Sequence, residues 1–128
     1  MIDHISIAVS DLEAGSRFYE TALAAFGFAK LVVRETTVGF GKKYPEFWLN
    51  HRPDMAALPS DSGAHVCLRA PSTEAVDEFY ANALKLGGTS DGAPGFRPGD
   101  HAGYYAAFVR DPDGNRLEAV TRRPEEQT

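Results

Sequence analysis

Two histidines and one glutamate in this chain, His4, His65 and Glu118, have side chains that together can bind a divalent metal ion. Two neutral imidazoles and one carboxylate hold such an ion and leave coordination positions open for water or substrate. Taken alone, each histidine has another interpretation, a hydrogen-bonded residue in the core or at its rim. The metal interpretation therefore depends on whether the fold brings the three residues together.

Glu118 lies in a predicted strand, Arg116–Val120, that follows the turn-forming residues Asp111–Asn115. Asp-Gly within such a cluster supplies the positive φ that a tight hairpin needs. Because side chains alternate along a strand, Glu118 faces away from the core if Leu117 and Ala119 face it. A carboxylate between apolar neighbours is costly to bury unless it is paired, hydrogen-bonded or bound to a cation. The alternative is an edge strand on which Glu118 is solvated.

The two histidines are related by an internal repeat. A shift of 61 positions superimposes His4 on His65 without a gap, and it also matches residues further along each half. We interpret the halves as two copies of one strand-helix-strands module, related by a pseudo-twofold axis that lies near both first strands. The other matched pairs are Glu13-Ala14 with Glu74-Ala75, Phe18-Tyr19 with Phe79-Tyr80, Ala22-Leu23 with Ala83-Leu84, and Gly27 with Gly88.

Each predicted module opens with an alternating strand that carries its histidine and continues into an amphipathic helix. A capping-box pattern, Ser10–Glu13, begins the first helix, and Pro71–Glu74 begins the second. In the second module a long Gly/Pro loop precedes the last hairpin, and loops of that length are often functional. The predicted elements are strand 2–9, helix 10–26, strands 30–37, 38–40 and 46–50, connector 52–63, strand 64–69, a helix from 71 that ends at Gly87, loop 92–103 and a hairpin from Tyr104.

Composition limits the classes of protein that fit this chain. Its 128 residues, 43% of them hydrophobic, fit one domain with a sizeable core, and the polar residues 123–128 predict a flexible tail. The net charge of -5 and the lack of a basic stripe argue against nucleic acid as a partner. No apolar run approaches the roughly 20 residues of a membrane helix, and Met1 leads directly into a strand. With its single Cys67, the chain is expected to be cytoplasmic.

The motifs around these residues resemble the vicinal oxygen chelate superfamily. That superfamily includes glyoxalase I, extradiol dioxygenases, fosfomycin-resistance thiol transferases and bleomycin-resistance proteins. The resemblance is carried by Asp3–Ile5, Ala64–Val66 and Asp111–Glu118, and it extends from Met1 to about Thr121. The closing Asp-Pro-Asp-Gly hairpin with its Leu-Glu pair is the most specific part.

The resemblance implies an α+β fold in which two tandem βαβββ modules, 1–57 and 62–122, form a cup-shaped mixed sheet within one glyoxalase-like domain, 1–122. It implies a homodimer, and it implies that His4, His65 and Glu118 bind a divalent metal ion such as Fe, Mn, Ni or Zn. Glyoxalase I adds a fourth ligand, a carboxylate at the place related to Glu118 by pseudosymmetry. Here Trp48 or a neighbour occupies that place, and Glu46 lies two residues earlier on the same strand face.

The implied function is that of a metal-dependent, glyoxalase-like enzyme of the lyase or isomerase type, acting on a small substrate with vicinal oxygens. An open-sided ion chelates adjacent oxygens and stabilises an enediolate or similar anion as a Lewis acid. The alternatives are an extradiol-type dioxygenase, a thiol transferase, or a metal-free binding protein of the bleomycin-resistance kind. A protein that only sequesters its ligand has no need of the complete set of three ligands.

Other residues are predicted to serve the substrate. Tyr104 or Tyr105, whichever faces inward, can donate a hydrogen bond, and we assign Tyr105, together with Glu118, to catalysis. In the long loop, Arg97 and His101 can close over an anionic substrate, although solvated loop side chains are the ordinary alternative. The predicted substrate pocket consists of Phe47, Trp48, Asn50, Arg97 and His101.

Overall fold

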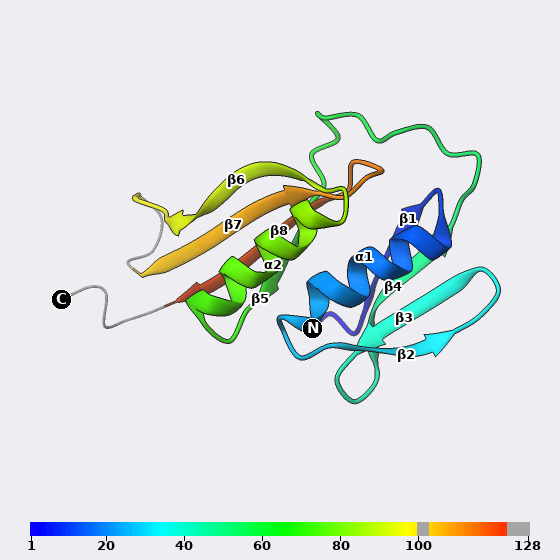
Figure 1. Ribbon diagram of the computed structural model, residues 1–128, viewed down its shortest axis with the longest axis horizontal. Coiled ribbons are helices and arrows are strands. Elements are labelled where there is room, and N and C mark those ends of the chain that lie inside the picture. The colour runs from blue at the N-terminus through cyan, green and yellow to red at the C-terminus, as the bar shows by residue number, and fades with distance from the viewer. Residues whose placement is uncertain (100–102, 123–128) are drawn as a thin grey trace.

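A computed structural model describes residues 1–99 and 103–122. The chain forms two similar halves that lie side by side, each a four-stranded sheet with one helix across it (Figure 1). The first half contains β1 (Ile5–Val9), α1 (Leu12–Ala24), β2 (Ala29–Val33), β3 (Thr37–Gly41) and β4 (Pro45–His51). The second contains β5 (Val66–Arg69), α2 (Thr73–Lys85), β6 (Thr89–Phe96), β7 (Tyr104–Arg110) and β8 (Arg116–Arg122).

Both sheets have the same mixed topology. Their strand orders are β1-β4-β3-β2 and β5-β8-β7-β6, so the first strand of each module lies at an edge and pairs in parallel with the last. The remaining neighbours are antiparallel. The predicted α+β fold of two tandem βαβββ modules is confirmed, with the strands divided between two four-stranded sheets.

Both helices lie on the same side of the molecule and bury their apolar faces against the sheets (Figure 1). Phe26 and Phe79 stack between the modules with ring centroids 5.2 Å apart, so the two helical layers share one core. The other face of each sheet has no helix over it among residues 1–99 and 103–122. Each helix has 13 residues, and no helix in this part of the chain is long and apolar enough to span a bilayer.

The turn Asp111–Asn115 of the second module is fastened to the first. The Asn115 side chain donates to the carbonyl of Ala8 at 2.9 Å, and the amide of Ser10 donates to the Asp113 carboxylate at 3.0 Å. The Tyr19 hydroxyl donates to Asp111 at 2.6 Å. The predicted strand-turn-strand is confirmed, and it holds the two sheets together as well as reversing the chain.

Two local predictions were wrong. Asp11, and not Ser10, caps α1, because its side chain accepts from the amide of Ala14 at 3.0 Å. The predicted loop 92–103 is a strand as far as Phe96, since β6 pairs with β7 through two register shifts that accommodate its glycines and proline. His101 and the predicted tail 123–128 lie outside the described residues.

Candidate functional site

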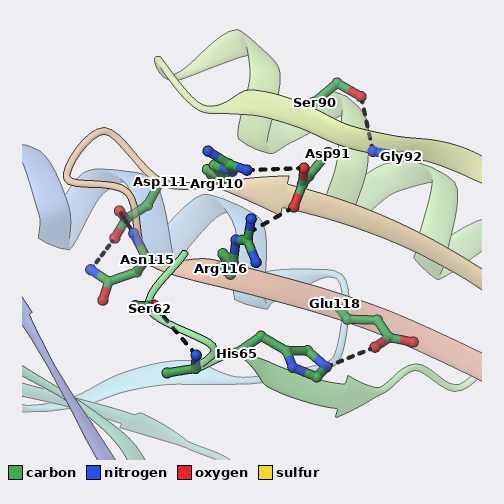
Figure 2. Close-up of polar contacts among 11 residues, drawn as sticks. Ser62, His65, Ser90, Asp91, Gly92, Arg110, Asp111, Asn115, Arg116 and Glu118 are labelled. Carbon is green, nitrogen blue, oxygen red and sulfur yellow. Dashed lines mark hydrogen bonds and ion pairs between the residues drawn. The ribbon is translucent and has the colours of Figure 1, made fainter. Parts of the chain in front are cut away.

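Glu118 and His65 form the centre of the candidate site. Leu117 and Ala119 are buried in the core, so Glu118 points to the face of the second sheet that α2 does not cover, as the alternation predicted. The Glu118 carboxylate is only 6% exposed, and its Oε1 lies 3.2 Å from Nε2 of His65, which projects from the residue before β5 (Figure 2). The carboxylate therefore has a partner, and the alternative of a solvated edge glutamate is excluded.

A tyrosine on the neighbouring strand contacts the same carboxylate. The hydroxyl of Tyr104 donates to Oε2 of Glu118 at 2.5 Å. Burial, followed by this hydrogen bond, raises the pKa of Tyr104, so its phenol stays protonated at neutral pH. Tyr105, which was assigned to catalysis, lies on the opposite face of β7 and donates to Asp77 of α2 at 2.6 Å. That assignment is corrected, because Tyr104 is the tyrosine that reaches Glu118.

Cys67 lies beside Glu118 in the β5–β8 pairing, on the face that carries His65. The residue as a whole is exposed, but its thiol is partly buried. This partial burial and the negative charge of Glu118 raise the pKa of Cys67 to about 11. The thiol is therefore protonated at neutral pH and is a poor nucleophile.

His4 lies on the first module, just before β1, and its imidazole is about half exposed. Its Nδ1 is 2.6 Å from the Asp3 carboxylate. A cavity of about 370 Å³ is bordered by His4, Glu46, His65 and Cys67. Within the part of the chain that the structure describes, no three His, Cys, Asp or Glu side chains are gathered closely enough to hold a metal ion. One chain thus pairs His65 with Glu118 but leaves His4 apart from them.

Strand registers identify the counterpart of Glu118 in the first module. Phe47 pairs with Ile5, and Leu117 pairs with Val66, the repeat-related residue. Trp48 therefore stands where Glu118 stands, as the sequence suggested. Its indole lies under the guanidinium of Arg34, 5.3 Å from the ring centroid. The site consequently has no fourth carboxylate of the glyoxalase I type at this position.

The predicted pocket residues occupy different environments. Phe47 is buried in the core against Tyr19, although it also borders the 370 Å³ cavity. Trp48 and Asn50 lie on β4 and are partly exposed. Arg97 follows β6 and folds back over the Phe108 ring, 5.2 Å from its centroid, so it lies against the sheet and not in a free loop.

Three polar residues near the site were missed from the sequence: Asp91, Arg110 and Arg116. Arg110 and Arg116 form a pair on β7 and β8, and Asp91 of β6 lies between their guanidinium groups (Figure 2). Alternation along the strand had placed Arg116 on the same face as Glu118, but Arg116 was not assigned to the site. Asp91 could not have been placed, because its segment was interpreted as a loop.

Comparison with known proteins gives a family match and two related sequences. Residues 1–119 match the family model for the Glyoxalase/Bleomycin resistance protein/Dioxygenase superfamily. The chain is 27% identical over 124 residues to virulence protein STM3117 of Salmonella typhimurium, covering 91% of this chain and 81% of that protein. It is 29% identical over 129 residues to lactoylglutathione lyase GLX1 of Arabidopsis thaliana, covering 94% of this chain but only 44% of that enzyme.

Solved structures share the fold. A glyoxalase/bleomycin resistance protein from Albidiferax ferrireducens has a TM-score of 0.81 and 29% identity, with 94% of this chain and 98% of that chain covered. A variant of the fosfomycin resistance protein FosX from Listeria monocytogenes, in complex with Mn(II) and a dihydroxypropylphosphonic acid, has a TM-score of 0.71 at 17% identity, with 99% and 94% covered. At 17% identity, the similarity to FosX concerns the fold alone.

Proposed function

The chain belongs to the Glyoxalase/Bleomycin resistance protein/Dioxygenase superfamily, and from this premise we propose that it is a metal-dependent, glyoxalase-like enzyme acting on a small substrate with vicinal oxygens. One observation carries the proposal: the buried Glu118 carboxylate lies 3.2 Å from Nε2 of His65 at the edge of a cavity. Burying a carboxylate is unfavourable without compensation, and this one points to the open face of the sheet, where a cation can reach it.

The donor set fits a divalent ion of the Fe, Mn, Ni or Zn type. His65, Glu118 and His4 would hold it, and nitrogen with carboxylate ligands suits all four metals. Asp3 binds Nδ1 of His4 at 2.6 Å, which leaves Nε2 as the ligand atom, and such a carboxylate behind a histidine is common at metal sites. When bound, the ion supplies a Lewis acid for adjacent substrate oxygens.

We assign the third ligand to a second copy of the chain. Within one chain, His65 and Glu118 are adjacent, whereas His4 lies on the other module and is directed to Asp3. A homodimer with twofold symmetry would contain two equivalent sites, each combining His65 and Glu118 of one copy with His4 of the other. We therefore propose that the protein is a homodimer. Its free Cys67 favours a reducing compartment such as the cytoplasm.

The chain's own residues have distinct roles in this proposal. Tyr104 holds the Glu118 carboxylate in place by donating to Oε2, while Oε1 remains beside His65. The cavity of about 370 Å³ is large enough for a small metabolite, and its walls include the apolar Ile5, Val66 and Leu68. The likeness to a lactoylglutathione lyase supports lyase or isomerase chemistry.

Metal titration of wild-type and single-variant proteins tests the ligands. The wild type should take up close to one divalent ion per chain, and His4→Ala, His65→Ala and Glu118→Gln should each abolish that uptake. His51→Ala, on β4 and outside the cavity, is the matched control and should bind normally. Absence of uptake by the wild type would favour the alternative, a metal-free binding protein, and normal uptake by His65→Ala would refute the ligand assignment.

Mixing variants tests the second copy. Metal-free His4→Ala and His65→Ala chains should each bind no metal alone. After the two variants are mixed and exchange subunits, half of the dimers should contain one chain of each kind, and one of the two sites in each mixed dimer should be intact. The mixture should therefore bind about a quarter of the metal that the wild type binds. A site built within one chain would give no recovery. The measurement is metal content after dialysis, with size-exclusion chromatography to verify the dimer.

A further inference from the structure

We propose that the substrate of this site carries an oxyanion, such as a carboxylate or phosphate group, and that Arg116 binds it beside His65 with the help of Arg97 and Arg110. The inference rests on the proposed function, because it names the substrate class of the same site. It is drawn from the second sheet, whose open face carries Arg110 and Arg116, with Arg97 folded over Phe108.

The three arginines lie on or just after neighbouring strands near Phe108, and two of them are tied to that residue: Arg97 through its ring and Arg116 through a shared cavity. Arg97 lies over the Phe108 ring and donates to the carbonyls of Ala93 at 2.6 Å and Ala106 at 3.0 Å. Arg110 and Arg116 are paired residues of β7 and β8. Phe108 itself pairs with Glu118, so the arginines lie on the same surface as the candidate metal ligands.

The positive charge of this cluster is only partly compensated. Asp91 is the carboxylate in contact with it, at 3.4 Å from Arg110 and 3.8 Å from Arg116, and one carboxylate cannot neutralise both. Arg97 is held by carbonyl groups, which carry no charge to offset its own. An excess of positive charge is thus concentrated at one place on a chain whose net charge is -5. Such a patch attracts small anions.

Two of the three arginines also have an unused donor. The Nε atoms of Arg97 and Arg110 are buried and donate no hydrogen bond to any atom of the described residues, whereas Nε of Arg116 faces Oδ2 of Asp91 at 3.8 Å. Buried donors are nearly always satisfied in native proteins, and an unpaired donor on a charged group costs more than a neutral one. An oxyanion supplies acceptors that match a guanidinium group in both charge and geometry.

A cavity next to this cluster has room for the anion. It has a volume of about 170 Å³ and is bordered by Arg116, Asp91, Phe108, His65 and the segment Gly63–Ala64. His65 borders this cavity and the 370 Å³ cavity that reaches His4. In Figure 2, Arg116 lies between Asp91 and the His65–Glu118 pair. A substrate can therefore place its anionic group at Arg116 and its reacting oxygens at the metal ligands.

Asp91 separates this proposal from a purely structural ion-pair network. If the arginines serve only to pair with Asp91, removing its charge leaves them unsatisfied and gives no new binding. If they form an anion site, Asp91 competes with the ligand, so Asp91→Asn should bind anions more tightly. Arg17, which pairs on the surface of α1 with Glu13 at 3.1 Å, provides a control arginine far from the cluster.

The experiment is calorimetric titration of metal-free protein, kept in chelator, with inorganic phosphate and with benzoate in separate runs. We expect the wild type to bind at least one of them in the millimolar range or better, and the preferred anion shows whether the group is tetrahedral or planar. Arg116→Gln should weaken binding by roughly tenfold to a hundredfold, the range for a lost charge-assisted hydrogen bond. Asp91→Asn should strengthen it severalfold, and Arg17→Gln should leave it unchanged.

Several results would overturn the proposal: no binding of either anion by the wild type, equal binding by Arg116→Gln, or weaker binding by Asp91→Asn. Arg97→Gln provides a second test if Arg116→Gln does not fold, as judged by circular dichroism. Because metal is absent throughout, failure of the metal site leaves this result intact. Conversely, a protein that binds metal through His65 and Glu118 but binds neither anion retains the proposed function and loses only this inference.

Discussion

The hydroxyl of Tyr104 and Oε2 of Glu118 are joined by a hydrogen bond of 2.5 Å between neighbouring strands. This contact leaves Oε1 of the same carboxylate beside His65. Groups that orient a metal-binding carboxylate typically change metal affinity by 10- to 100-fold when they are removed. Tyr104 is thus a positioning residue for the proposed metal site.

Replacing this tyrosine should weaken metal binding without preventing it. In competition with a chromophoric chelator, Tyr104→Phe should bind the divalent ion about 10- to 100-fold more weakly than the wild type. Tyr105→Phe loses a similar hydroxyl, but that hydroxyl binds Asp77 on the helical side, so its metal affinity should equal that of the wild type. Equal affinity in both variants would contradict the role assigned to Tyr104.

Cys67 reports on the charge of Glu118. With its pKa raised to about 11, the thiol in metal-free protein at pH 8 should react with iodoacetamide roughly a hundredfold more slowly than a free cysteine. Glu118→Gln removes a neighbouring negative charge, lowers the pKa of Cys67 and should speed alkylation severalfold. Glu78→Gln, exposed on α2, is the control and should have no effect. Because the chain has one cysteine, mass spectrometry follows the reaction directly.

The buried contact between Tyr19 and Asp111 should contribute strongly to stability. Tyr19→Phe removes the buried 2.6 Å hydrogen bond to Oδ2 of Asp111 and leaves that oxygen with only the Asn115 side chain as donor, which should cost about 1–3 kcal/mol in the free energy of unfolding. Tyr44→Phe, at an exposed tyrosine, should cost little by comparison. Urea unfolding followed by circular dichroism measures both, and equal losses would show that the hydroxyl of Tyr19 does not matter.

The same carboxylate predicts a pH dependence. Burial raises the pKa of Asp111 above its ordinary value of 3.8, against the opposing effect of its hydrogen bonds to Tyr19 and Asn115. As the pH falls toward that ordinary value, the folded state takes up this proton before the unfolded state does, so the contribution of Asp111 to stability increases. The difference in unfolding free energy between wild type and Asp111→Asn should therefore grow in favour of wild type as the pH falls from 7 toward 4.

A difference that shrinks over this range would mean that the hydrogen bonds outweigh burial. Subtracting the unfolding free energy of the variant from that of the wild type cancels the pH dependence contributed by most other titrating groups, because Asp111→Asn leaves those groups in place.

Local patterns were sufficient for the architecture and for part of the site. The repeat placed His4 and His65 at equivalent module positions, and alternation placed Glu118 opposite Leu117 and Ala119, as the structure confirms. The sequence had also narrowed the counterpart of Glu118 to Trp48 or a neighbour, and the strand registers identify Trp48. These predictions succeeded because side-chain direction along a strand has a period of two and is a property of the chain itself.

Predictions failed where neighbouring strands determined the result. The segment from Gly92 to Phe96 is rich in glycine and was interpreted as a loop, but hydrogen bonds from β7 make it a strand and bring Asp91 and Arg97 to the open face. Tyr104 and Tyr105 are adjacent residues of similar character. Only the packing of α2 against β7 decides that Tyr105 faces the helix.

The sequence by itself determined the doubled βαβββ fold, the family and the face on which Glu118 lies, because these follow from periodicity and from motifs contained in short segments. The tertiary structure decided which side chains meet: His65 and Tyr104 at Glu118, Asp91 between two arginines, and His4 apart from the pair. Contacts between residues distant in the sequence depend on strand register and on the packing of one module against the other. Neither is encoded in the pattern of any single segment.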